Sequence, residues 1–99
     1  MKVLVLAQAN DSLRRSLQYL SRYYDQRYLL AMERLIRQRI KWLADNPGGG
    51  QFEPELEWSN KGYRRLVVKE FMIIYRIDDE VIVVYDIFDS RRDPTRMKG

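Results

Sequence analysis

Apolar residues recur at helical spacing in the first half of the chain. Near its start, intervals of four, three and four residues place four side chains on one face of a helix: Leu13, Leu17, Leu20 and Tyr24. The polar run Asn10-Asp11-Ser12 just before them offers oxygens that cap a helix N-terminus. We therefore predict a first helix that begins at this run and ends near Asp25.

A second helix is predicted from about Gln26 to Ala44. Its main apolar stripe is formed by Leu29, Met32, Ile36, Ile40 and Leu43, and every seventh residue along the flank is also apolar: Tyr28, Leu35 and Trp42. So wide an apolar face packs against both another helix and a sheet. The run Asn46-Pro47-Gly48-Gly49-Gly50 ends the helix. On its polar side stand Arg27, Arg34, Arg37 and Lys41, which we interpret as a solvated face.

The remaining apolar runs are short and β-branched, as in strands. A first strand is predicted at Val3–Ala7, and three more follow residue 62, at Tyr63–Lys69, Phe71–Ile77 and Val81–Phe88. The polar link Asp78-Asp79-Glu80 joins the last two as a hairpin. Residues 51–60 are predicted to be an irregular acidic connection that carries Glu53, Glu55 and Glu57.

The predicted order is β-α-α-β-β-β, which places a helical hairpin against a mostly antiparallel sheet, an α+β fold. A chain of 99 residues with 45% hydrophobic positions suits one domain over 1–99, with a flexible tail at about 93–99. Only five apolar residues follow Met1-Lys2, too few for a signal peptide, and no run approaches membrane-spanning length. We expect a cytoplasmic protein without membrane contact.

The residue types that are missing narrow the chemistry. The chain has no Cys and no His, so thiolate and imidazole metal ligands are absent and a Ser-His-Asp enzyme is excluded. We expect no metal site and no cofactor. Any catalysis would depend on Arg, Lys, Tyr, Asp or Glu.

Positive charge is concentrated in the first half. Residues 1–52 carry 9 basic and 4 acidic side chains, against 9 and 10 in residues 53–99, for a net charge of +4. Of the 18 cations, 13 are Arg, the side chain suited to bidentate contacts with carboxylates and phosphates. The pattern predicts an acidic partner, either nucleic acid or an acidic protein segment.

Three segments together resemble the RelE/ParE superfamily over nearly the whole chain. They are the strand that carries Arg64, the hairpin end Tyr75-Arg76-Ile77, and the closing run Arg91-Arg92-Asp93-Pro94. The resemblance implies a toxin of a bacterial type II toxin–antitoxin module, bound and neutralised by a small antitoxin in a hetero-oligomer. RelE-like members cut messenger RNA on the ribosome, and ParE-like members inhibit DNA gyrase by binding it.

Departures from the RelE-like pattern favour the ParE-like alternative. Many members have a His where the last strand meets Arg91, and this chain has Phe88-Asp89-Ser90. RelE-like members usually place an Arg where Met72 stands, and a Tyr or His in the C-terminal segment, where nothing after Tyr85 qualifies. We predict gyrase inhibition. The alternatives are a ribosome-dependent mRNA endoribonuclease and a non-toxic protein-interaction module.

The candidate site residues are arginines near strand ends. We predict that Arg64, Arg65, Arg91 and Arg92 bind the target or its phosphates; in a ribonuclease, the catalytic set would be Arg64, Arg65, Asp89 and Arg91, with Asp89 as base. Neighbours on a strand point to opposite faces, so Arg64 and Arg65 separate. The alternative is structural: strand arginines paired with Glu70 or Asp86, and a solvated tail paired with Asp89 or Asp93.

Overall fold

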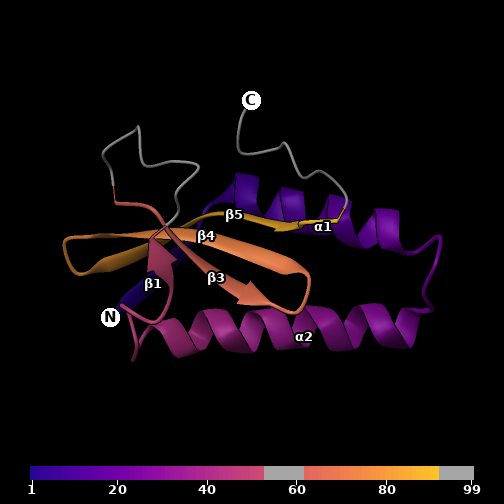
Figure 1. The fold of residues 1–99 in the computed structure, drawn as a ribbon, viewed down its shortest axis with the longest axis horizontal. Coiled ribbons are helices and arrows are strands. Elements are labelled where there is room, and N and C mark those ends of the chain that lie inside the picture. The colour runs from indigo at the N-terminus through magenta and orange to yellow at the C-terminus, as the bar shows by residue number, and fades with distance from the viewer. Residues whose placement is uncertain (53–61, 92–99) are drawn as a thin grey trace.

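The computed structural model describes residues 1–52 and 62–91. In chain order its elements are β1 (Lys2–Val5), α1 (Ala7–Leu20), α2 (Gln26–Leu43), β2 (Gln51–Phe52), β3 (Arg64–Val68), β4 (Phe71–Asp78) and β5 (Val81–Asp89) (Figure 1). The predicted α+β order is confirmed, with β2 as a short addition. The prediction of a single domain stays a prediction, and the tail at 93–99 lies outside the described residues. Neither described helix is long and apolar enough to cross a membrane.

The strands form one sheet in the order β1-β5-β4-β3-β2. The first and last strands lie side by side and are parallel, with Lys2 opposite Val81 and Val5 opposite Val84. All other neighbours are antiparallel, so the sheet is mostly antiparallel as predicted. Because β1 stands at the end of this order, one of its edges pairs with no strand of the described chain.

Helix α2 follows its prediction almost to the residue because its two ends are encoded locally. At the start, the Asp25 carboxylate accepts a hydrogen bond from the backbone N–H of Tyr28 at 2.9 Å, which satisfies a donor that the first helical turn leaves unpaired. At the end, the Asn46 side chain donates to the Trp42 carbonyl at 3.1 Å, just before Pro47 prevents continuation.

The predicted start of α1 is wrong. The helix begins three residues before Asn10, at Ala7, and has no side-chain cap. Ser12 is buried inside the helix, and Asp11 forms a surface ion pair with Arg14 at 3.3 Å. The helix also ends earlier than predicted, at Leu20, because residues 21–24 form turns. Buried Ala9 continues the stripe of Leu13 and Leu20 toward the N-terminus, and this small residue was not counted in the prediction.

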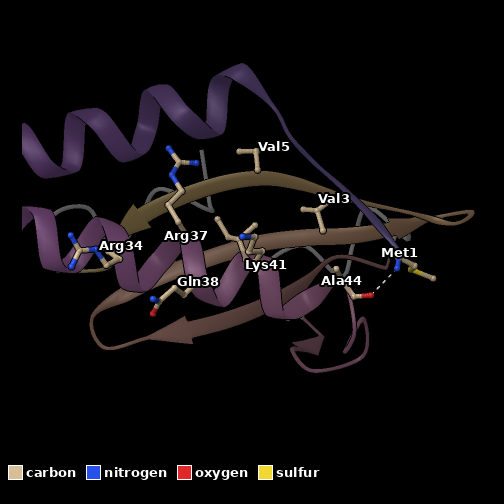
Figure 2. A pocket seen from close by; sticks show the side chains of 9 residues that line it. Met1, Val3, Val5, Arg34, Arg37, Gln38, Lys41 and Ala44 are labelled. Atoms are coloured by element: carbon tan, nitrogen blue, oxygen red, sulfur yellow. Dashed lines mark hydrogen bonds between the residues drawn. The ribbon is translucent and has the colours of Figure 1, made fainter.

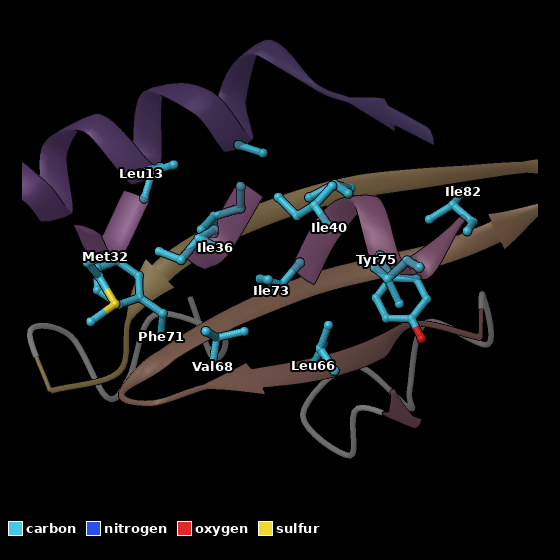
Figure 3. Packing of buried hydrophobic residues seen from close by; sticks show 14 of the residues in the cluster. Leu13, Met32, Ile36, Ile40, Leu66, Val68, Phe71, Ile73, Tyr75 and Ile82 are labelled. Carbon is cyan, nitrogen blue, oxygen red and sulfur yellow. The ribbon is translucent and has the colours of Figure 1, made fainter. Parts of the chain in front are cut away.

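The main core lies between the two helices and one face of the sheet (Figure 3). From α2 it takes Met32, Ile36, Ile40 and Leu43, all buried as the predicted stripe requires. From the sheet it takes Ile73, Tyr75, Ile82 and Val84, each fully inaccessible to solvent. Full burial of one aliphatic side chain contributes about 1.5–3 kcal/mol, so this layer is what holds the helical hairpin on the sheet.

The strand region differs from prediction in detail. The first strand ends at Val5 because Ala7 already belongs to α1. Gln51 and Phe52, predicted to be irregular, pair with Arg65 and Arg64 as β2. The hairpin between β4 and β5 turns as predicted. The acidic residues of the connection lie within 53–61, outside the described residues.

Candidate target-binding site

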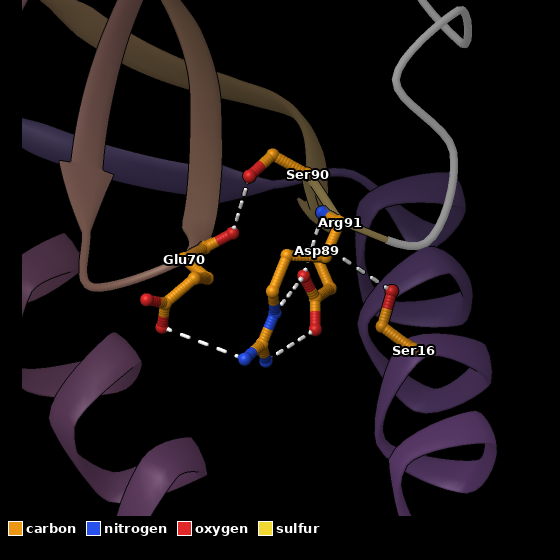
Figure 4. A network of polar contacts seen from close by, with 5 residues as sticks. All are labelled: Ser16, Glu70, Asp89, Ser90 and Arg91. Carbon is orange, nitrogen blue, oxygen red and sulfur yellow. Dashed lines mark hydrogen bonds and ion pairs between the residues drawn. The ribbon is translucent and has the colours of Figure 1, made fainter.

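Arg91 is fixed by the last residue of β5. Its guanidinium donates two hydrogen bonds to the Asp89 carboxylate, from Nε to Oδ1 at 3.1 Å and from Nη2 to Oδ2 at 2.8 Å. The backbone N–H of Arg91 donates to Oδ1 as well, at 2.9 Å. Two parallel hydrogen bonds are the strongest arrangement available to an arginine and a carboxylate. The guanidinium of Arg91 is therefore held in one orientation (Figure 4).

The surroundings of Asp89 explain why it needs Arg91. Asp89 is only 1% exposed, and its backbone N–H donates to the Ser16 hydroxyl of α1 at 3.2 Å. A carboxylate taken out of water is costly unless it is paired and hydrogen-bonded. Arg91 supplies both forms of compensation while its own side chain stays 42% exposed. The contact therefore stabilises the fold and still presents part of a cation to solvent.

A second acidic residue lies on the other side of Arg91. Glu70, in the turn between β3 and β4, approaches Nη1 of Arg91 at 3.8 Å, and both side chains are about half exposed. Ser90 ties the same turn to the end of β5, because its N–H and its hydroxyl donate to the Glu70 carbonyl at 2.8 and 2.9 Å. We call Ser16, Glu70, Asp89, Ser90 and Arg91 the Arg91 network.

Tyrosines of the helical hairpin surround the exposed side of this network. Hydrogen bonding with Asp89, and secondarily its charge and the side chains of Tyr24 and Tyr28, raise the pKa of Arg91 above its ordinary value, so the guanidinium stays charged at any pH the protein meets. A hollow of about 260 Å³ lies here, lined by Tyr19, Leu20, Tyr23, Tyr24, Asp89 and Arg91. The rings of Tyr24 and Tyr28 stack with centroids 4.2 Å apart.

Arg64 is held elsewhere, by the loop that follows α2. Its Nη1 donates to the Gly50 carbonyl at 3.1 Å. The hydroxyl of buried Tyr75 accepts from the Gly50 N–H at 2.8 Å and donates to the Pro47 carbonyl at 3.0 Å. A Cβ on Gly50 would stand 2.5 Å from the Arg65 carbonyl oxygen, so the loop can close here only on glycine. Arg64 thus helps to hold this loop on the sheet.

The structure brings Asp89 and Arg91 together but keeps Arg64 apart from them. Asp89 pairs with Phe71 in the sheet, and Arg64 pairs with Tyr75, four residues further along β4. At about 3.3 Å per residue, the two pairs lie about 13 Å apart along the strand. Arg65 pairs with Ile74 and therefore faces away from Arg64, as predicted. Arg92 lies outside the described residues.

Sequence reasoning missed three residues that shape these contacts. Tyr75 and Gly50 meet although 25 residues separate them, and Ser16 meets Asp89 across 73 residues. The burial of Ser16 could have been inferred from its position on the stripe of Ala9, Leu13 and Leu20. Among the described residues, no three acidic, His or Cys side chains gather closely enough to hold a metal ion.

Comparisons with known proteins identify the family of the chain. The family model described as the ParE toxin of the type II toxin–antitoxin system parDE matches residues 3–94. The chain belongs to the ParE toxin family. A solved structure titled as the chromosomal ParDE toxin–antitoxin system from P. aeruginosa is similar, with a TM-score of 0.72 at 19% identity, and the alignment covers 90% of this chain and 95% of that one. No curated protein sequence matches the chain.

Membership of the ParE toxin family confirms the predicted superfamily and the ParE-like side of it. The chain is thus the toxin component of a type II toxin–antitoxin system, and such a system implies an antitoxin as partner. The structural similarity shows the fold. Of the predicted target-binding residues, Arg91 is 42% exposed and borders the tyrosine-lined hollow, whereas Arg64 contacts the loop after α2.

Proposed function

We propose that this ParE-type toxin inhibits DNA gyrase by binding it, in the cytoplasm, and that no RNA is cut. The observation that carries the proposal is the state of Asp89, the predicted base of a ribonuclease. Its carboxylate is buried and accepts three hydrogen bonds from Arg91. A general base must reach the proton that it abstracts, and this carboxylate is turned inward.

The positions of the arginines support the same conclusion. Cleavage by a 2′-OH requires a base, an acid and stabilisation of the developing charge at one point. Arg64 contacts the Gly50 carbonyl about 13 Å along β4 from the Arg91 network, by the strand spacing. An arginine whose pKa is already above about 12 also supplies neither acid nor base. The candidate arginines are therefore better suited to binding a target than to catalysing RNA cleavage.

The proposed gyrase contact is the tyrosine patch, by which we mean Tyr19, Tyr23 and Tyr24 in the hollow beside Arg91. Tyr23 is 66% exposed, and Tyr24 is partly exposed beside it. Arg22 lies over the ring of Tyr19, with its guanidinium carbon 5.7 Å from the centroid. Tyrosine and arginine dominate the energetics of protein interfaces because they combine large apolar area with a polar tip. Such a patch on a mostly polar helical hairpin indicates a protein target.

Supercoiling of relaxed plasmid by purified gyrase, run beside ribosome-dependent cleavage of mRNA, tests the proposal. We expect loss of supercoiling and intact message. Tyr23→Ala should weaken inhibition at least about tenfold without lowering the melting temperature, as expected for an interface hot spot. Leu30→Ala, an exposed apolar residue on α2, is the matched control and should leave inhibition unchanged.

Two outcomes contradict the proposal. Cleaved message with untouched supercoiling would assign the chain to the ribonuclease alternative. Neither activity, from a folded and monodisperse chain, would favour the non-toxic interaction module.

A further inference from the structure

The turn between β3 and β4 holds a residue in a backbone conformation to which that residue is poorly suited. Among the described residues, three have a positive φ: Gly62 at 69°, Asp79 at 57° and Lys69 at 54°. Glycine adopts this left-handed conformation freely and aspartate tolerates it. A lysine adopts it at a cost, because its Cβ crowds the following carbonyl oxygen. Lys69 is therefore the strained position of the three.

The turn that contains Lys69 is short and is held on both sides. Val68 pairs with Phe71, so the loop consists of Lys69 and Glu70 alone. Ser90, which follows β5, donates its N–H and its hydroxyl to the Glu70 carbonyl at 2.8 and 2.9 Å (Figure 4). These contacts keep the backbone of the turn from relaxing, so Lys69 leaves the sheet in a fixed direction.

The fold gains no polar contact from the lysine side chain. Lys69 is exposed, and within residues 1–52 and 62–91 its ammonium makes no ion pair or hydrogen bond. Asp79, at the same place in the turn between β4 and β5, is of a type that this conformation accepts. Residues that break a local rule without compensation in the fold occur mainly at functional sites. The combination indicates a role for Lys69 outside the fold.

Lys69 borders the Arg91 network. Glu70, the next residue, approaches Nη1 of Arg91 at 3.8 Å, and Arg91 lines the hollow of the tyrosine patch. The turn is thus attached to the contacts that orient Arg91, at the edge of the proposed gyrase contact. Charged side chains at the rim of an interface raise the rate of association and select the partner.

We propose that Lys69 belongs to the surface that binds the target, and that its ammonium pairs with a carboxylate of the target protein at the rim of the contact made by the tyrosine patch. The inference rests on the proposed inhibition of gyrase by binding. A nucleic acid suits this position less well, because the carboxylates of Glu70 and Asp89 lie in the adjoining network and repel a chain of phosphates. A single carboxylate can approach Lys69 alone.

A structural explanation of Lys69 makes the opposite prediction for stability. The Arg91 network contains two carboxylates, those of Glu70 and Asp89, and one guanidinium, so a nearby lysine would balance its charge within the chain. Under that explanation, removal of the lysine destabilises the protein. If the lysine serves the target instead, its removal relieves the strained backbone and does not destabilise the protein.

The test compares Lys69→Gly and Lys69→Asn with the parent chain. Both replacements suit the left-handed backbone, so the melting temperature should stay constant or rise by up to about 6 °C. Inhibition of supercoiling by purified gyrase should weaken at least about fivefold at low ionic strength, and the loss should shrink as salt is added. Lys69→Arg keeps the charge and should inhibit within about twofold of the parent chain.

Two control variants separate this effect from a general one. Asp79→Gly makes the same backbone change in the turn between β4 and β5. Lys41→Gln removes one positive charge from α2, beside the hollow of about 490 Å³ that this helix forms with β1 (Figure 2). Each should change inhibition by less than about twofold. If either weakens inhibition as much as Lys69→Gly does, the role assigned to Lys69 is wrong.

Three other results would overturn the inference. They are full inhibition by Lys69→Gly, a fall of more than about 3 °C in its melting temperature, and binding of duplex DNA by the parent chain that the variant has lost. Growth arrest in bacterial cells that express the chain reports toxicity whatever the target. A parent chain that arrests growth but leaves supercoiling untouched refutes the gyrase proposal. In that case, weaker arrest by the folded Lys69→Gly variant retains the role of Lys69, and equal arrest refutes it as well.

Discussion

Replacing Arg91 with alanine tests the role assigned to the Arg91 network. The substitution leaves the Asp89 carboxylate buried, with one backbone N–H from residue 91 as its remaining partner in this contact. Breaking a buried pair by removing one member costs about 3–5 kcal/mol in general. Because Arg91 is 42% exposed and solvent already screens it, we expect a smaller loss of unfolding free energy, about 2–3 kcal/mol.

A loss of this size is a large share of the total, since domains of this length have unfolding free energies of about 5–15 kcal/mol. Urea denaturation measures it directly. With an m-value of about 1.5 kcal/mol/M, the midpoint should fall by about 1.3–2 M. The m-value itself should stay constant, because the change removes a local contact and leaves the buried area of the core intact.

Two further variants separate this explanation from a general loss of packing. Glu70→Gln removes only the half-exposed contact at 3.8 Å and should cost less than about 1 kcal/mol. Asp89→Asn, introduced together with Arg91→Ala, should recover about 1 kcal/mol or more, because a neutral amide is cheaper to bury than an unpaired carboxylate. If Arg91→Ala changes stability by less than about 0.5 kcal/mol, or the double variant recovers nothing, the carboxylate is not what Arg91 compensates.

Three other substitutions test the fold, each by urea or thermal unfolding. Gly50→Ala should cost about 2 kcal/mol or more, because the new Cβ overlaps a backbone oxygen and a buried tyrosine hydroxyl, whereas Gly48→Ala meets nothing within 4 Å and should cost little. Asp25→Ala removes a helix cap and should cost about 1 kcal/mol, and equal costs at Asp25 and exposed Asp11 would contradict the assigned caps. Ile36→Ala, at a fully buried position, should cost about 2–5 kcal/mol, and a near-neutral result would mean that α2 does not pack as described.

Features encoded by neighbouring residues were predictable from the sequence. Asp25 and Pro47 mark the two ends of α2, and the stripe between them identifies the face that packs on the sheet. The start of α1 was not predictable by the same rule. The chain offers good cap residues at Asn10 and Asp11, but burial of Ala9 in the core continues the helix back to Ala7 and overrides the local preference.

Among the contacts of the candidate site, too, only those between residues close in sequence were predictable. The ion pair of Asp89 with Arg91 was foreseen as the structural alternative, because the two residues are close in sequence. The contact of Arg64 with Gly50 was not foreseen, since it requires the loop after α2 to return to β3. Similarly, the hollow that Arg34, Arg37 and Lys41 of α2 form with β1 was not predictable. The two elements are separated in the sequence by α1, and only the fold brings them together.

The parallel pairing of β1 with β5 has a consequence for synthesis of the toxin. Lys2 is translated long before its partner Val81, so this pair can form only after the helical hairpin and the strands between them have been made. Contacts that close so long a loop are slow to form, and β1 has no other strand beside it within the described sheet. We expect chains that stop before β5 to lack the completed sheet, so that the folded toxin exists only after β5 has been synthesised.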